Sequence, residues 1–367
     1  MATGGKKIRT LVVDDSTFMR KVLVGIIAAD PQLEVVGQAK DGREAVDMAE
    51  SLKPDVITMD INMPRLDGLQ ATELIMSTSP RPIVIVSSES RAGADSTLRA
   101  LELGAVEFVP KPSSGIDLDM NKVGEELNRK LKMAAKVRVV RTATRSKIDG
   151  TPGSRKCSLS STAGTLAPGA RFPMIVIAAS TGGPATVMRL VPNFPKDFPA
   201  AVFLVQHMPA AFTAQYALQL AEVTPMRVKE AESNETAQAG TIYICPGSHH
   251  LRVTSSGRIQ LDEGPRISGY RPCADAALES LAAHAGNMAI GVVLTGMGND
   301  GAQGVKAVKA AGGFVIAQDE ATAVIFGMPA EAIKTGTVDQ VLGIDDVYPA
   351  IERRVALLTR AVPVGVR

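Results

Sequence analysis

The chain of 367 residues is too long for one typical domain, and its size predicts two or three. A content of 45% apolar and 21% charged residues is ordinary for soluble globular proteins, and no apolar run approaches the about 18 residues that a membrane span needs. The net charge of +2 comes from one short basic segment, residues 129–156 with 10 Lys/Arg and 1 Asp/Glu, and this excludes the broad positive face of a nucleic-acid-binding output domain.

The three cysteines, Cys157, Cys245 and Cys273, lack the spacing of a zinc site or a disulfide framework and favour a reducing compartment. The first apolar run, residues 11–13, is cut off at once by two aspartates, so we expect neither a signal peptide nor a membrane anchor. We therefore expect a cytoplasmic protein without direct membrane insertion.

Residues 8–110 alternate between strand-length apolar runs and segments of helical periodicity. The runs are IRTLVVDD, LEVVGQA, DVITMD, PIVIVSS and VEFVP. This alternation predicts a flavodoxin-like, doubly wound parallel sheet of five strands, whose ligand site lies at the carboxyl ends of the strands.

Polar residues follow four of these runs: Asp14 and Asp15 the first, Asp60 the third, Ser87 the fourth and Lys111 the fifth. Carboxylates at neighbouring strand ends repel one another unless a hard cation lies among them, and Mg²⁺ prefers such oxygen ligands. A lysine and a hydroxyl beside them suit a phosphoryl group on one carboxylate. The strand ends therefore predict a magnesium-dependent phosphorylation site.

With the motif DINMPRLDG at residues 60–68, the first 120 or so residues resemble the receiver domain of two-component response regulators. The resemblance implies that Asp60 accepts a phosphoryl group from a histidine kinase. It implies Mg²⁺ ligands at Asp14, Asp15, Asp60 and the backbone carbonyl of Asn62, phosphate contacts at Ser87 and Lys111, and an aromatic switch at Phe108. It further implies a cis peptide bond between Lys111 and Pro112.

A last helix for this domain is marked by Val123, Leu127, Leu131 and Ala134, which gives a first domain of residues 1–135. Residues 136–171 are rich in Arg, Lys, Ser, Thr, Gly and Pro, a composition typical of a flexible linker. The linker is either a solvated tether or a segment that docks on an acidic surface.

Residues 172–367 alternate again, with the runs MIVIAA, AVFLVQH, AIGVVLTG and GGFVIAQ and a closing helix at about 345–358. The pattern predicts a second α/β domain with a largely parallel sheet. Residues 227–261 are more β-like and predict an antiparallel excursion, which includes GTIYICPGSHHL at residues 240–251.

The stretch IVIAASTGGP, residues 175–184, predicts a strand that ends at Ser180 and turns into a helix with proline in its first turn. The turn would expose a hydroxyl beside unpaired helix N–H groups, which suits a nucleophile. The alternative is an ordinary turn in which Ser180 or Thr181 caps the helix.

A nucleophilic serine needs a base and an acid that orients the base. Of four histidines, only His207 ends a run that belongs beside the Ser180 strand, whereas the others, His249, His250 and His284, are expected to be structural or surface residues. Asp300, in the loop GMGNDG at residues 296–301, is preferred as the acid over Asp262, Asp275, Asp319 and Asp339. Free N–H groups of this loop would bind an oxyanion.

The same loop supports a different class of protein. Gly296, Gly298 and Gly301 satisfy GxGxxG after a strand, and Asp319 follows about 20 residues later, as in a dinucleotide-binding fingerprint. A carboxylate at position 300 inside the phosphate-binding turn counts against this interpretation. It also leaves Ser180 and His207 without a role.

The motifs ASTGGP, QHMP, CPGSHHL, RPCAD and LTGMGNDG, in this order behind a receiver domain, resemble the chemotaxis protein-glutamate methylesterase family, CheB. The resemblance implies Ser180 as nucleophile, His207 as general base, Asp300 as orienting acid, the N–H of Met297 as oxyanion donor and Thr181 as a second polar contact. Cys273 stands where the family commonly has serine.

This second resemblance implies a hydrolase that demethylates glutamate methyl esters on methyl-accepting chemotaxis receptors, releases methanol and often deamidates receptor glutamines. The implied partners are a chemotaxis histidine kinase and the receptors, which serve as substrate and docking site. Ester hydrolysis would need no cofactor, and Mg²⁺ would serve only phosphorylation. The unphosphorylated receiver domain would cover the rim of the active site.

Overall fold

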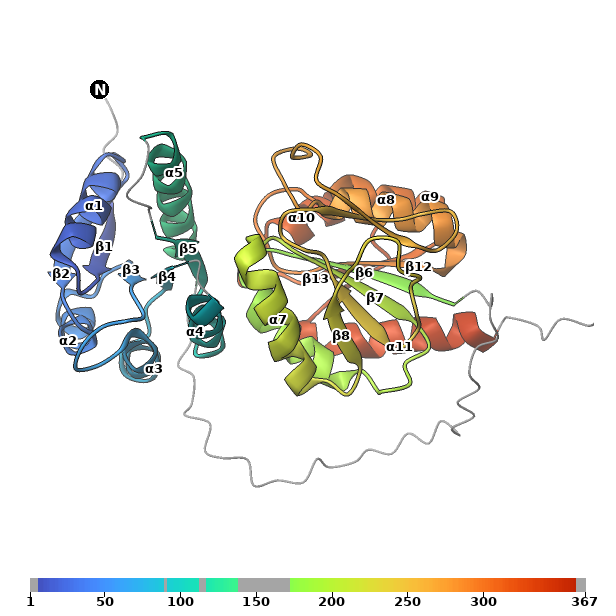
Figure 1. The fold of residues 1–367 in the computed structure, drawn as a ribbon, viewed down its shortest axis with the longest axis horizontal. Helices are drawn as coiled ribbons and strands as arrows, with labels where there is room; N and C mark the ends of the chain where they lie inside the picture. Colours follow the sequence, from blue (N-terminus) through green and yellow to red (C-terminus); the bar gives the residue numbers. More distant parts are fainter. Residues whose placement is uncertain (1–5, 89–90, 112–116, 138–171, 361–367) are drawn as a thin grey trace, which may run out of the picture.

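The structure, a computed structural model, describes residues 6–88, 91–111, 117–137 and 172–360. These residues form two α/β units that follow one another along the chain and lie side by side in Figure 1. No helix within these ranges is both long and apolar enough to cross a membrane.

The N-terminal unit is a parallel sheet of five strands in the order β2-β1-β3-β4-β5, which confirms the predicted fold. Its strands are β1 (Ile8–Val13), β2 (Leu33–Ala39), β3 (Val56–Met59), β4 (Ile83–Ser87) and β5 (Glu107–Pro110). Its helices are α1 (Thr17–Ala28), α2 (Gly42–Leu52), α3 (Gly68–Thr78), α4 (Arg91–Glu102) and α5 (Asp117–Ala134). The strand order reverses between β1 and β3, so Asp14 and Asp60 lie at the switch point where such sheets bind ligands.

The C-terminal unit is a parallel sheet of seven strands in the order β14-β13-β12-β6-β7-β9-β8. These strands are β6 (Met174–Ala179), β7 (Ala201–Gln206), β8 (Arg227–Glu230), β9 (Thr241–Ile244), β12 (Ala289–Val293), β13 (Phe314–Gln318) and β14 (Gln340–Leu342). The α-helices are α6 (Gly183–Leu190), α7 (Ala210–Val223), α8 (Ala274–Ala285), α9 (Ala302–Ala310), α10 (Met328–Lys334) and α11 (Ile344–Arg360), and two short 3₁₀ turns cover Val191–Asn193 and Gly286–Met288.

Helices cover both faces of this sheet (Figure 1), and the central strand β6 shows how the sequence accommodates them. Its side chains point alternately to the two faces. Ile175 and Ile177 join the core that contains residues of α6, α7 and α11, whereas Val176 and Ala178 join the core with α8 and α9. Because both faces are buried, the strand is a continuous apolar run with no polar alternation.

The antiparallel excursion is confirmed for β10 (His250–Val253) and β11 (Ile259–Asp262), which pair with each other. The prediction is wrong for residues 227–244, because β8 and β9 extend the parallel sheet beyond β7. All four residues of β9 are buried, so this strand serves the main core. The predicted boundaries at residues 135 and 172 stay predictions, since most of the basic linker, 138–171, lies outside the described residues.

The two units touch along α4 of the first and along α6 and α7 of the second. The ring of Phe108, in β5, lies 4.5 Å from the ring of Phe212 at the start of α7. Asp95 Oδ1 accepts hydrogen bonds from the amides of Gln215 and Gln219 at 3.0 and 3.2 Å. One apolar cluster contains both phenylalanines and is therefore continuous across the interface.

Candidate active site

Ser180 lies in the turn between β6 and α6. Its N–H donates to the carbonyl of Thr295 at 3.0 Å, and its carbonyl accepts the N–H of Gly183 at 2.8 Å. The cap of α6 is Gly182, and no side chain makes a hydrogen bond there. The interpretation of Ser180 or Thr181 as a helix cap is therefore wrong, and the hydroxyl of Ser180 is not used for capping.

His207 and Asp300 follow the two strands that flank β6, namely β7 on one side and β12 on the other. The N–H of His207 donates to the carbonyl of Ala179 at 3.0 Å, which brings this residue level with Ser180. Nε2 of His207 lies 2.7 Å from Oδ2 of Asp300. The three residues chosen from the sequence thus lie at one edge of the sheet, where adjacent parallel strands end.

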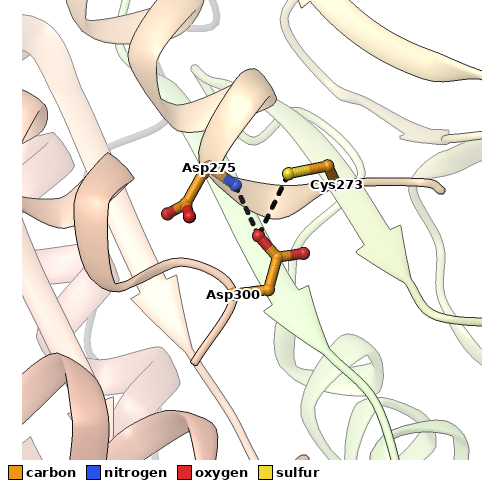
Figure 2. A group of neighbouring side chains, drawn as sticks. All are labelled: Cys273, Asp275 and Asp300. Atoms are coloured by element: carbon orange, nitrogen blue, oxygen red, sulfur yellow. Dashed lines mark hydrogen bonds between the residues drawn. The ribbon is translucent and has the colours of Figure 1, made fainter. Parts of the chain in front are cut away.

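Asp300 is 2% exposed and is held at the N-terminus of α8 (Figure 2). Oδ2 accepts the N–H of Ala274 at 2.7 Å, and Oδ1 accepts the N–H of Asp275 at 2.9 Å and the thiol of Cys273 at 3.2 Å. Burial acts to raise the pKa of Asp300, but the hydrogen bond and charge of His207, with the two backbone N–H groups, lower it below its usual value. The carboxylate is therefore kept charged beside the imidazole.

Cys273, Asp275 and Asp300 lie close enough together to resemble a metal site, with ligand atoms within 4.8 Å of one another (Figure 2). Burial, with the charge of Asp300, raises the pKa of Cys273 to about 12, and its thiol already donates a hydrogen bond to Oδ1 of Asp300. Asp275 Oδ1 already accepts the N–H groups of Gln303 and Gly304 at 3.0 and 2.7 Å. The group is therefore a hydrogen-bonded support that joins α8, α9 and the acid.

The loop after β12 packs its backbone directly against Ser180. A Cβ placed on Gly296 would lie 2.8 Å from Cβ of Ser180 and 2.3 Å from the sulfur of Met328, so only glycine fits there. The carbonyl of Gly296 accepts the N–H of Met328 at 2.8 Å, which fixes the loop. Met297, the residue expected to supply the oxyanion N–H, is next along this loop.

The dinucleotide alternative finds no support in this loop. Gly298 has a φ of +93°, and a Cβ there would lie 1.9 Å from the hydroxyl oxygen of Tyr270, so a side chain occupies the space that a phosphate would need. The carboxylate of Asp319 accepts hydrogen bonds from the backbone N–H and the hydroxyl of Thr322, at 2.9 and 2.7 Å. It therefore stabilises the local turn of residues 319–322. The carboxylate of Asp300 is tied to His207.

Two residues of this site were missed in the sequence. Gln206 is 1% exposed, and its Nε2 donates to the carbonyls of Ser180 and His207 at 2.8 and 3.3 Å, so it links the two turns. Tyr270 stacks on the imidazole of His207, with ring centroids 4.7 Å apart and planes 17° apart. Gln206 is the first residue of the motif QHMP, and Tyr270 directly precedes RPCAD. Neither residue type indicates from the sequence which residue it contacts.

The remaining histidines have structural contacts, as expected. His249 Nε2 lies 3.0 Å from a carboxylate oxygen of Glu263. The rings of His250 and His284 lie within hydrogen-bond distance of the backbone carbonyls of Pro265 and Ser255, at 3.1 Å each.

Thr181, which the resemblance implied as a second polar contact of the site, directs its hydroxyl at the first unit. Its hydroxyl donates to Oε2 of Glu107 at 2.7 Å. Nearby, the guanidinium of Arg129 on α5 lies 3.0 Å from the sulfur of Met297. Residues of the N-terminal unit therefore touch both turns that surround Ser180.

The carboxylates of Asp14, Asp15 and Asp60 lie within 4.8 Å of one another at the switch point of the first sheet. Nζ of Lys111 lies 3.0 Å from Asp14 and 2.8 Å from Asp60. Burial raises the pKa of Asp60 despite this lysine, and hydrogen bonds to the two aspartates outweigh burial and raise the pKa of Lys111. Three hard oxygen donors with one lysine retain negative charge, which fits Mg²⁺.

The hydroxyl of Ser87 lies at the end of β4 and donates to the carbonyls of Ser88 and Gly93 at 3.3 Å each. Asn62 follows Asp60 in the turn after β3, where its backbone carbonyl is expected to serve the metal. The predicted cis peptide bond before Pro112 lies outside the described residues.

Comparison with known proteins gives two family matches, which together cover both units. Residues 10–121 match the response regulator receiver domain, and residues 175–351 match the CheB methylesterase model. A Pyrococcus horikoshii protein named protein-glutamate methylesterase/protein-glutamine glutaminase is 44% identical, over 96% of this chain and 95% of its own length. A Symbiobacterium thermophilum protein of the same name is 42% identical, over 95% and 98%.

Among solved structures, the CheB methylesterase catalytic domain of Thermotoga maritima is 40% identical to this chain. It covers 51% of this chain and 100% of its own length, with a TM-score of 0.49.

Proposed function

The chain belongs to the CheB methylesterase family, with a receiver domain ahead of the esterase domain, and we propose that it hydrolyses glutamate methyl esters on methyl-accepting chemotaxis receptors. Methanol is the released product, and receptor glutamines are deamidated by the same site. The relatives' names point to both activities. The observation that carries the proposal is the 2.7 Å contact between His207 and Asp300 at the strand ends beside Ser180.

The reaction is an acyl transfer through a serine ester. His207 takes the proton of the Ser180 hydroxyl as Oγ attacks the ester carbonyl, and the same proton then passes to the departing methoxide, which leaves as methanol. Since Nε2 is engaged by Asp300, the proton is taken at Nδ1. Water then attacks the acyl-serine, and its proton returns to Ser180, which frees the glutamate carboxylate.

The surroundings lower the barrier by electrostatics. The charged carboxylate of Asp300 orients the imidazole and stabilises the imidazolium that forms during attack. The N–H of Met297 and the N-terminus of α6 face the negative charge that develops on the carbonyl oxygen. The close approach of the Gly296 backbone to Ser180 supports Met297, the next residue, as this donor.

The receiver domain supplies regulation. Asp60 accepts a phosphoryl group from a chemotaxis histidine kinase, and Ser87 and Lys111 contact the phosphate. Mg²⁺ would be held by Asp14, Asp15, Asp60 and the carbonyl of Asn62, and when bound it neutralises charge on the phosphoryl oxygens.

The unphosphorylated receiver domain restrains the esterase through the contacts at the interface. Glu107 holds Thr181, and Phe108 packs on Phe212. Lys111 already contacts Asp60 at 2.8 Å, so a phosphoryl group on Asp60 chiefly draws Ser87 toward it. This moves α4 and β5, which form the interface. Loosening of the interface then opens the rim around Ser180 to the receptor.

Methanol release from methylated receptor tests this function. Ser180→Ala should reduce kcat at least about 10³-fold, because the nucleophile is lost. Ser256→Ala is the matched control, since this exposed serine contacts only Thr254 among the hydrogen bonds of the described residues. Full activity of the Ser180 variant would discard the mechanism.

A further inference from the structure

Tyr270 lies against the residue that acts as general base, and the mechanism above gives it no role. Its ring is half-buried and nearly parallel to the imidazole of His207, with ring centroids 4.7 Å apart and planes 17° apart. This is the distance of a stacked pair in contact. The arrangement therefore fixes the plane of the imidazole from one side.

A tight hairpin turn presents Tyr270 to the imidazole. Tyr270 and Ile267 exchange both backbone hydrogen bonds, at 3.0 and 2.9 Å, around Ser268 and Gly269. These two central residues have φ values of +50° and +89°, as a two-residue hairpin requires. The turn constrains the backbone of Tyr270 and so sets the point from which its ring projects.

The hydroxyl end of the tyrosine meets the loop that carries Asp300. A Cβ on Gly298 would lie 1.9 Å from the Tyr270 hydroxyl oxygen and 3.1 Å from Cζ, so the ring edge rests on the glycine backbone. Tyr270 is therefore wedged between His207 and the loop. A few residues further on, Cys273, Ala274 and Asp275 bind the carboxylate of Asp300.

The imidazole needs this wedge because one hydrogen bond does not define its plane. The contact of Nε2 with Asp300 leaves the ring free to tilt about that bond, and a tilt moves Nδ1 away from Ser180. A stacked aromatic face opposes the tilt, and its π electrons also favour the imidazolium that forms during attack.

We propose that Tyr270 is a positioning residue that holds the imidazole of His207 in its catalytic plane by stacking. The proposal rests on the proposed function, since it takes His207 as the base. The aromatic face, and not the hydroxyl, provides the effect. Phenylalanine should therefore replace tyrosine at this position, whereas an aliphatic residue should not.

The test compares the full-length native chain with Tyr270→Phe, Tyr270→Leu and Tyr270→Met in methanol release from methylated receptor. The leucine and methionine variants should lower kcat about ten-fold and leave KM within about two-fold, because ground-state binding is untouched. The phenylalanine variant should keep kcat within about two-fold of the native value.

Proton NMR of the His207 ring provides a readout independent of activity. The ring resonances are identified by their loss in His207→Gln. Stacking shifts them through the ring current of Tyr270, so they should move in the leucine and methionine variants and stay near their native positions in the phenylalanine variant. Thermal unfolding shows which variants are folded. If Tyr270→Leu does not fold, Tyr270→Met serves as the aliphatic variant in the comparison.

Native kcat and native His207 resonances in a folded aliphatic variant would overturn the proposal. Equal loss of kcat in the phenylalanine and aliphatic variants would also overturn it, because the hydroxyl would then be the active group. Full activity of His207→Gln would instead refute the assignment of His207 as the base. This failure of the proposed function can be told apart from a failure of the stacking proposal, because the ring-current shift does not depend on turnover.

Discussion

The hydroxyl of Thr181 donates a 2.7 Å hydrogen bond to Oε2 of Glu107, which joins the turn after β6 to the last strand of the receiver domain. Glu107 is 8% exposed, and its other carboxylate oxygen lies 3.5 Å from Lys130. A hydrogen bond to a buried charge is stronger than one between neutral groups. Because Thr181 directly follows Ser180, this hydrogen bond links the receiver domain to the residue next to the proposed nucleophile.

Removal of this contact should release the esterase without phosphorylation. We predict that Glu107→Ala raises basal methanol release about ten-fold, in line with the loss of one hydrogen bond to a charged group. Glu73→Ala, at an exposed position on α3, is the matched control and should leave the basal rate unchanged. A basal rate equal to that of the native chain would show that Glu107 does not restrain the esterase.

Activation should depend on Asp60. Asp60→Asn removes the acceptor carboxylate but keeps the side-chain volume, so we predict that an acyl phosphate with Mg²⁺ no longer raises the rate, while basal release stays within about two-fold. Measurement of the rate with and without the phosphodonor checks this. Asp47→Asn, at an exposed position on α2, should be activated normally. Activation that survives in Asp60→Asn would place the phosphorylation site elsewhere.

Strand ends explain why much of the site was predictable. In each sheet the candidate residues come after buried apolar runs, and parallel strands bring such positions to the same edge of the sheet. These residues are Asp14 and Asp60 in the first sheet and Ser180, His207 and Asp300 in the second. The central strands are buried on both faces, so their runs are long and easily recognised. Pairing at the sheet border was less predictable, because no residue of the short strand β8 is fully buried and its sequence gave no sign of its parallel partner.

Contacts made outside the sheets were not predictable from local pattern. Tyr270 reaches His207 from a hairpin, and the direction of a hairpin depends on tertiary packing. Glu107 meets Thr181 across a domain interface, and its position in β5 suggests only a strand residue. Long-range polar pairs leave no periodicity in the sequence.

The acid should be needed for turnover. Asp300→Asn keeps the shape of the side chain but removes the charge that holds the imidazole, so we predict that kcat falls by about 10³-fold or more. Steady-state methanol release measures this, with the exposed Asp262→Asn as control. A fall of only a few-fold would favour another acid.

The same carboxylate should contribute to stability in a pH-dependent way. Its pKa is lowered in the folded protein, so its contribution is present above the ordinary pKa of an aspartate and is lost as the pH falls through the lowered value. We predict that at neutral pH Asp300→Asn is less stable than the native chain by about 1–3 kcal/mol, as expected when buried partners are left unsatisfied. Urea unfolding should show this difference shrinking as the pH falls below about 4, the ordinary range of an aspartate. A difference that grows on acidification would contradict the lowered pKa.

Cys273 should be inert toward thiol reagents while the protein is folded. The thiol is 1% exposed, and burial with the neighbouring charge of Asp300 raises its pKa to about 12, so almost none of it is thiolate at pH 8. We predict that a maleimide labels Cys273 at least about 10³-fold more slowly in the native chain than in urea, since the unfolded thiol has an ordinary pKa. Mass spectrometry of the labelled peptide measures both rates, and the urea sample controls for access and reagent quality. If the native chain were labelled as fast as the unfolded chain, the hydrogen bond between the Cys273 thiol and Asp300 would have to break readily in the folded protein. The hydrogen bonds at the start of α8 would then not hold Asp300 in place.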